Sequence, residues 1–180
     1  MSHSIAFRLR LPATAVLVAA ALLAGCGDDD GDGTTTAATG GAAIVEPAEL
    51  GDAADRIGQP IYWVGERDGK ILELVEADAG RVYVRYLDEG EEAGVRSAEF
   101  LTIATYPTRD PVAALRREAK RRQRAELAKS EDGAVVLIDP DEPSSVYLAY
   151  PGDENQIEVY SPDPREAVEL ARSGAVDPVR

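Results

Sequence analysis

The chain has few of the side chains that carry most nucleophilic and transition-metal chemistry. Its 180 residues include one cysteine, Cys26, one histidine, His3, and one methionine, Met1. A single cysteine excludes a disulfide within the chain, and any Ser-His-Asp or Cys-His arrangement would have to use His3. Zinc, copper and iron sites need several imidazoles or thiolates, which leaves only oxygen-ligated cations such as calcium. We expect no metal site and no cofactor.

These three residues lie in or directly after a segment that is typical of an export signal. Arg8 and Arg10 precede an apolar run over residues 11–24, and small residues end that run. A membrane-spanning helix needs about 20 apolar residues, and the acidic segment 27–30 follows too soon for one. We therefore expect residues 1–25 to be removed as a signal peptide, which leaves a chain without histidine or methionine.

Leu23-Ala24-Gly25-Cys26 resembles the lipobox of bacterial lipoproteins, in which the cysteine sulfur receives a diacylglyceryl group and becomes the new N-terminus. The resemblance implies that Cys26 is the lipid attachment site. The alternative is a plain secretory signal followed by a free thiol. Two or three acyl chains, at about 0.8 kcal/mol per buried methylene, give durable attachment. We expect a protein that is lipid-anchored at the extracytoplasmic face of the cell membrane and does not span it.

Negative charge dominates the composition. The chain has 33 Asp and Glu against 19 Lys and Arg, a net charge of −14, and removal of Arg8 and Arg10 makes it −16. Such a balance argues against nucleic acid as a partner. The expected partners are the membrane, through the N-terminal lipid, and either a protein or an anionic polymer of the cell envelope.

Residues 26–46 have the composition of a lipidated, flexible and acidic tether. Between positions 27 and 43 only Gly, Asp, Thr and Ala occur, without apolar periodicity. The D-x-D-x-D-G pattern that begins at Asp28 matches the opening of a calcium-binding EF-hand loop. Its twelfth position is Thr39 instead of the required glutamate, which favours an acidic spacer.

Residues 47–180 are expected to form a single α+β domain. Strand signals occupy 61–64, 71–76, 81–87, 101–106, 135–138, 146–150 and 157–160. Helices are predicted over 47–57, which ends at Gly58, over 111–129, which begins after Asp110, and over 164–172, which begins after Asp163.

The two halves of this domain are alike in order and spacing. The motif V-Y-V-R-Y at Val82 has a counterpart, V-Y-L-A-Y, 64 positions later at Val146. Each is followed by a strand that ends in tyrosine and by an Asp-Pro helix start. Either two β-β-β-α units are duplicated, or generic strand and cap chemistry makes them alike. We expect one antiparallel sheet with both helices on one face, which leaves the other face or the central seam for a partner.

The strand over residues 81–87 carries the first candidate binding surface. Alternation puts Arg81, Tyr83 and Arg85 on the face opposite Val82 and Val84. A stripe of cations and tyrosine that faces water could bind a carbohydrate or a peptide strand. The alternative is that the tyrosines simply fill an antiparallel sheet.

The predicted helix over residues 111–129 carries the second candidate surface. A narrow apolar stripe leaves a wide cationic arc that includes Arg117, Arg121 and Arg124. One interpretation is a docking patch for anionic polymers, phospholipid headgroups or an acidic partner. The other is a solvated face that the protein's own carboxylates balance.

Four segments resemble a group of uncharacterised exported domains that we associate with high-GC actinobacteria. They are G-Q-P-I-Y-W-V-G at position 58, V-Y-V-R-Y-L at 82, F-L-T-I-A-T-Y-P at 100 and S-V-Y-L-A-Y-P at 145. The resemblance implies an exported domain with these limits, and it implies no activity, ligand or catalytic residue.

Together these features favour a non-enzymatic lipoprotein that binds a partner in the cell envelope. The common hydrolase and phosphate-binding motifs do not occur in the sequence. The alternative is a carboxylate-dependent hydrolase that acts on envelope glycans, since two of the 33 carboxylates could form a catalytic pair. No pair stands out in the sequence, so no catalytic residue is predicted.

Mass spectrometry of the protein from its native membrane tests the lipid anchor. We expect a mature chain that begins at Cys26 and carries a diacylglyceryl group on its sulfur, because the lipobox directs both reactions. An intact and unmodified leader on the native product would contradict this.

Overall fold

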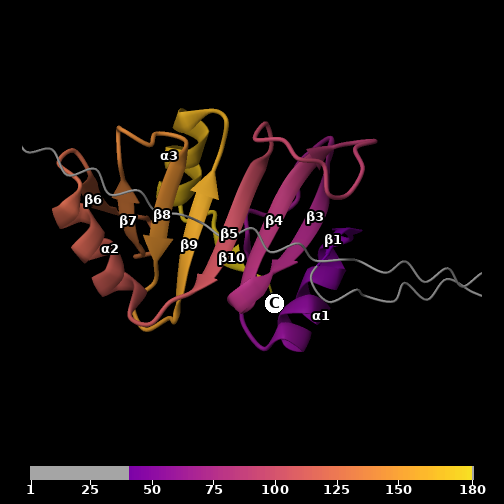
Figure 1. Cartoon of the computed structure of the whole chain (residues 1–180), viewed down its shortest axis with the longest axis horizontal. Coiled ribbons are helices and arrows are strands. Elements are labelled where there is room, and N and C mark those ends of the chain that lie inside the picture. Colours follow the sequence, from indigo (N-terminus) through magenta and orange to yellow (C-terminus); the bar gives the residue numbers. More distant parts are fainter. Residues whose placement is uncertain (1–40, 180) are drawn as a thin grey trace, which may run out of the picture. The chain divides into compact units, whose positions relative to one another are not determined.

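Eight antiparallel strands form the main sheet of this computed structural model, which describes residues 41–179 (Figure 1). Their order across the sheet is β1-β3-β4-β5-β9-β8-β7-β6. The strands are β1 (Ala42–Val45), β3 (Lys70–Ala77), β4 (Arg81–Asp88), β5 (Leu101–Pro107), β6 (Glu126–Lys129), β7 (Val135–Ile138), β8 (Ser145–Ala149) and β9 (Asn155–Tyr160). A second, two-stranded sheet pairs β2 (Tyr62–Trp63) with β10 (Asp177–Pro178).

Three helices, α1 (Pro47–Ile57), α2 (Pro111–Arg121) and α3 (Pro164–Arg172), complete the fold with one 3-10 turn at Asp78–Gly80. The predicted α+β class with an antiparallel sheet is confirmed. No helix between residues 41 and 179 has the length and apolar character needed to cross a membrane.

The helix ends follow the local signals in the sequence. The Asp110 carboxylate accepts a hydrogen bond from the Ala113 amide (3.2 Å), and Asp163 caps α3 through the Arg165 amide (2.9 Å). α1 ends at Gly58, whose φ of 76° lies in the left-handed region that glycine adopts without strain. The predicted starts of α2 and α3 and the predicted end of α1 are therefore confirmed.

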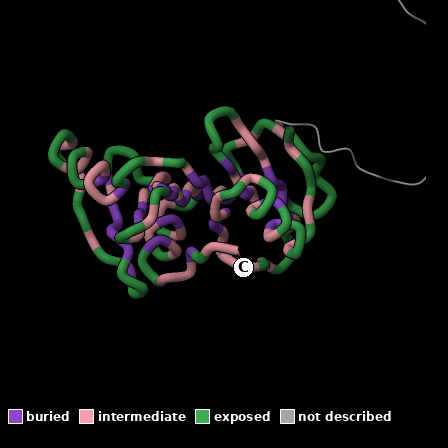
Figure 2. The backbone as a smooth tube through the Cα atoms, turned by 90° about the horizontal axis from the view of Figure 1, so that it is seen from below, coloured by how far each residue is buried: buried purple, intermediate pink, exposed green. Residues whose placement is uncertain are grey.

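One face of the main sheet holds the principal hydrophobic core, beneath α1 and α3. Val84 of β4, Ile103 of β5 and Ile157 of β9 are fully buried there. α1 adds Leu50, and α3 adds Ala167. In Figure 2 the buried segments of the backbone lie in the interior, and exposed segments surround them.

α2 lies on the opposite face of the sheet, over β7 and β8. Its Leu115 packs against Ala149 of β8 and against Val135 and Leu137 of β7, which flank the principal-core residue Val136. The expectation that both helices share one face is therefore wrong. The reason is visible in β7, whose Val-Val-Leu-Ile sequence is apolar at every position and is buried on both faces.

α2 ends at Arg121 rather than near Lys129, so the predicted helix is too long. Arg122 already has extended backbone angles (φ −93°, ψ 124°). The chain then turns, and residues 126–129 form the edge strand β6, with Leu127 opposite Leu137. Pairing with an apolar strand outweighs the helix propensity of this basic segment.

The N-terminal boundary of the folded part also differs from the prediction. Residues 42–45, which the sequence assigned to the tether, pair with β3 as β1, with Ala42 opposite Val75 and Val45 opposite Leu72. The folded region therefore extends beyond the predicted limit at residue 47. The signal segment, Cys26 and the rest of the tether lie outside the described residues.

The sheet order is symmetric about the central β5–β9 pair. Tyr83 lies opposite Ala104, and Tyr147 lies opposite Glu158, so the two V-Y motifs occupy matching registers. The helices break this symmetry, because α2 and α3 cover opposite faces. Duplication of the two units therefore stays a prediction.

Leu115→Ala tests the smaller core between α2 and the sheet, which Leu115 forms with Val135, Leu137 and Ala149. We expect it to lower the free energy of unfolding by about 2–5 kcal/mol, because a buried leucine leaves a cavity. Leu127→Ala on β6 is the matched control, since that side chain is 44 % exposed and its truncation should cost about 0.5 kcal/mol or less. Urea unfolding measures both, and equal losses would contradict the placement of α2.

Candidate functional site

Beyond α2, the second face of the sheet carries tyrosines from four strands. They are Tyr83 of β4, Tyr106 of β5, Tyr147 of β8 and Tyr160 of β9, and each is partly buried. Together with Glu158 of β9 they form a surface that we name the tyrosine face. It lies at the central seam of the sheet.

The register of four strands brings these residues together. Tyr83, Ala104, Glu158 and Tyr147 lie side by side in one row across β4, β5, β9 and β8. Tyr106 and Tyr160 point to the same face, because they lie two residues from this row along their strands. Because the side chain of Ala104 is small, the surface of the sheet has a depression between Tyr83 and Glu158.

A hollow of about 230 Å³ opens at this depression. Two of its walls are the rings of Tyr83 and Tyr106, whose centroids are 6.0 Å apart and whose planes meet at 87°. The lining residues are Tyr83, Ser97, Thr102, Ala104, Tyr106, Glu158 and Tyr160. The hollow is therefore an aromatic corner with one carboxylate on its wall.

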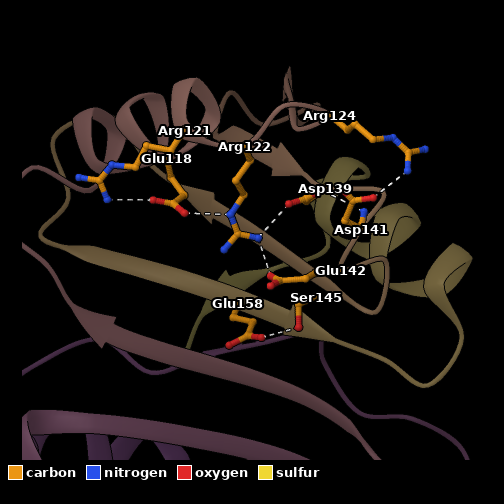
Figure 3. A network of polar contacts seen from close by, with 9 residues as sticks. All are labelled: Glu118, Arg121, Arg122, Arg124, Asp139, Asp141, Glu142, Ser145 and Glu158. Carbon is orange, nitrogen blue, oxygen red and sulfur yellow. Dashed lines mark hydrogen bonds and ion pairs between the residues drawn. The ribbon is translucent and has the colours of Figure 1, made fainter. Parts of the chain in front are cut away.

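Glu158 is held by hydroxyl groups alone. Its two oxygens accept hydrogen bonds from the Tyr106 hydroxyl (2.6 Å) and the Ser145 hydroxyl (2.6 Å), the second of which Figure 3 shows. No lysine or arginine within residues 41–179 forms an ion pair with it. Its negative charge is therefore offset only by neutral dipoles.

Two tyrosines beside Glu158, Tyr106 and Tyr147, have raised pKa values. Burial is the largest cause that raises the pKa of Tyr147, to about 12, and the charge of Glu158 adds to it. Burial and then the hydrogen bond to Glu158 raise the pKa of Tyr106 further above its ordinary value. Both hydroxyls therefore stay neutral donors across the physiological range.

Arg85, a predicted binding residue, makes several contacts within the protein. Its guanidinium pairs with Glu73, which is fully buried, and donates to the carbonyl oxygens of Val95 (3.0 Å) and Ser97 (3.1 Å). The Tyr160 hydroxyl donates to a neighbouring carbonyl of the same loop. These bonds hold the β4–β5 loop at one end of the hollow and occupy the Arg85 guanidinium, so that Arg85 binds a ligand stays a prediction.

Arg81 does not line the hollow either. It is exposed at the start of β4, and its Nε donates to the Asp78 carbonyl (3.0 Å). Of the predicted stripe, only Tyr83 lies in the site.

Much of the predicted basic surface is neutralised by the protein itself (Figure 3). Arg121 pairs with Glu118 at 3.3 Å, and Arg124, which lies beyond the end of α2, pairs with Asp141 at 2.7 Å. Arg117 is exposed on α2 and has no ion pair among the described residues. For Arg121 and Arg124 the geometry favours the balanced, solvated face over a docking patch.

Arg122 is the centre of this network. Its guanidinium contacts Glu118 (2.9 Å), Asp139 (2.9 Å) and Glu142 (2.5 Å), three carboxylates for one cation. Arg122 lowers the pKa of Glu118 mainly by its hydrogen bond, and at Asp139 it adds to the backbone hydrogen bond from Asp141. The cluster fastens the end of α2 to the β7–β8 loop.

Sequence reasoning missed Ala104, Tyr106, Glu158 and Tyr160. Tyr106 and Tyr160 were visible as the ends of two similar strands, which is the one local signal for them. Nothing local indicates that Glu158 lies in the same row as Tyr83, because this depends on pairing between β5 and β9.

The hollow of the tyrosine face offers aromatic rings and a carboxylate as contact groups. Glu158 is the one carboxylate in its lining, whereas glycoside hydrolysis uses two. The carboxyl groups with clearly displaced pKa values in residues 41–179 are Glu118, Asp132 and Asp139, and all are lowered. A general acid would need a raised pKa. The same residues contain no cluster of three or more metal-ligating side chains.

Comparison of the chain with known protein families, with curated proteins and with solved structures found no match. The resemblance to exported actinobacterial domains stays a prediction.

Arg85→Met tests the buried ion pair beside the hollow. We expect a loss of about 3–5 kcal/mol in the free energy of unfolding, because Glu73 would remain as an unpaired buried charge. Arg124→Met is the matched control, since its pair with Asp141 is well exposed and should contribute about 1 kcal/mol or less. Urea unfolding compares the two variants.

A further Glu73→Leu change in the Arg85→Met background should recover much of the stability, since it removes the stranded charge. The assignment fails if Arg85→Met costs no more than Arg124→Met.

Proposed function

We propose that the protein is a non-enzymatic binding module, attached by a lipid on Cys26 to the extracytoplasmic face of the cell membrane. It binds a protein of the cell envelope through the tyrosine face. The observation that carries this proposal is the hollow over Ala104, walled by tyrosine rings on the side of the sheet opposite α1 and α3. Partly buried tyrosines with free ring surface are typical of protein interfaces.

The charges support a protein partner over an anionic polymer. The chain has a net charge of −14, and the hollow contains an uncompensated carboxylate, Glu158. An anionic polymer would instead need the basic segment, where Arg121, Arg122 and Arg124 are already paired. The alternative function, hydrolysis of envelope glycans, draws no support from a hollow with a single carboxylate.

Photo-crosslinking in cells that export the full chain tests this function. A photoreactive aromatic amino acid in place of Tyr83 should yield a discrete adduct with an envelope protein, because this side chain lines the hollow. The control is the same amino acid in place of Asp52, which is exposed on α1, over the other face of the sheet. The same adducts from both positions, or none from Tyr83, would contradict the proposal.

A further inference from the structure

The hollow of the tyrosine face combines two features that attract an organic cation. The first is its aromatic walls, since ring faces carry negative charge density and bind ammonium and guanidinium groups. Tyr83 and Tyr106 meet at 87°, so a group placed in their corner contacts two differently oriented rings. Tyr160 lines the hollow from β9.

The second feature is an anion without a countercharge. Glu158 accepts one hydrogen bond at each oxygen and has the Tyr147 hydroxyl as a further neighbour, whereas an ionised carboxylate has about four acceptor positions. Positions therefore remain for N–H donors of a ligand. A bond from a charged donor to a carboxylate is roughly twice as strong as one between neutral groups.

Three arginines near the hollow have partners within the protein, whereas Arg96, which precedes the lining residue Ser97, is exposed. Arg85 pairs with buried Glu73, and Arg81 donates to a backbone carbonyl. Arg122, near Tyr147 on the opposite side of the tyrosine face, forms ion pairs with three carboxylates. The carboxylate in the lining and the large excess of acidic residues in the chain favour a cation over an anion as the ligand.

The size of the hollow indicates what kind of molecule carries the cation. Pockets that enclose a whole small ligand have volumes of about 300–1,000 Å³, and this hollow has about 230 Å³. A shallow recess on an open surface instead suits one anchoring side chain of a larger partner.

We infer that the hollow receives a lysine or arginine side chain of a polypeptide partner, with Glu158 as acceptor and the rings of Tyr83, Tyr106 and Tyr160 around the cation. This inference rests on the proposed function and adds the chemistry of recognition.

Peptide titration of the full chain tests this inference. The probes are three blocked tripeptides, Gly-Lys-Gly, Gly-Arg-Gly and Gly-norleucine-Gly, and the backbone amide NMR signals of Ala104 and Glu158 report binding. We expect the lysine or the arginine peptide to bind at least about tenfold more tightly than the norleucine peptide, which has the apolar stem of lysine and no charge. Equal affinities for all three peptides would overturn the inference.

Three variants locate the binding. Glu158→Gln should weaken the basic peptides about tenfold and leave the norleucine peptide unchanged. Tyr83→Leu, which keeps apolar bulk but removes a ring, should also weaken them, and it decides the test if Glu158→Gln does not fold. Glu126→Gln on the distant strand β6 changes the net charge equally and should have no effect. A loss as large in Glu126→Gln would show general attraction only, and would overturn the site.

Two outcomes separate the possible failures. Tighter binding of tetramethylammonium than of either basic peptide would overturn the polypeptide side chain in favour of a small quaternary ammonium ligand. A crosslinked protein at Tyr83, together with equal affinities for the three peptides, would overturn the cation site and leave the proposed function standing.

Discussion

The hydrogen-bonded pairing of β5 with β9 is the contact on which the rest of the fold depends. It joins the two four-stranded halves of the sheet through strands that lie about fifty residues apart in the chain, from Thr102 opposite Tyr160 to Pro107 opposite Asn155. On one face this pairing makes a continuous core, because Ile103 meets Val159 there. On the other face it sets Ala104 beside Glu158, so the core and the hollow of the tyrosine face arise from one register.

The position of α2 decides which part of the second face stays accessible. α2 covers the half of the sheet where β7 and β8 are apolar on both faces, and it leaves the seam with its tyrosines. Arg122 and its three carboxylates hold the end of α2, while Arg85 holds the β4–β5 loop. Two regions therefore border the tyrosine face, the end of α2 and the β4–β5 loop, and arginine contacts hold each of them in place.

The charged side chains of this acidic chain differ in whether they have a partner of opposite charge. Glu73 is buried, and Arg85 neutralises it; the exposed Arg124 has Asp141. Glu158 differs, because a partly buried carboxylate among aromatic rings has only hydroxyl donors. A buried charge that is not paired costs stability, and a partner that supplies a cation would offset that cost. This links the electrostatics of the sheet to the proposed recognition.

The sequence by itself determined the features that depend on near neighbours: the α+β class, the positions of the strands other than β1, β6 and β10, the caps at Asp110 and Asp163, and the alternation of Val82 and Tyr83 between faces. Only the tertiary structure decided the end of α2, the strand β1, the side of the sheet that α2 covers, and the site around Glu158. Caps and alternation involve atoms a few residues apart, so local composition specifies them. Sheet order, the choice of face and the partner of Arg85 depend on contacts between distant segments, whose free energies no local pattern encodes.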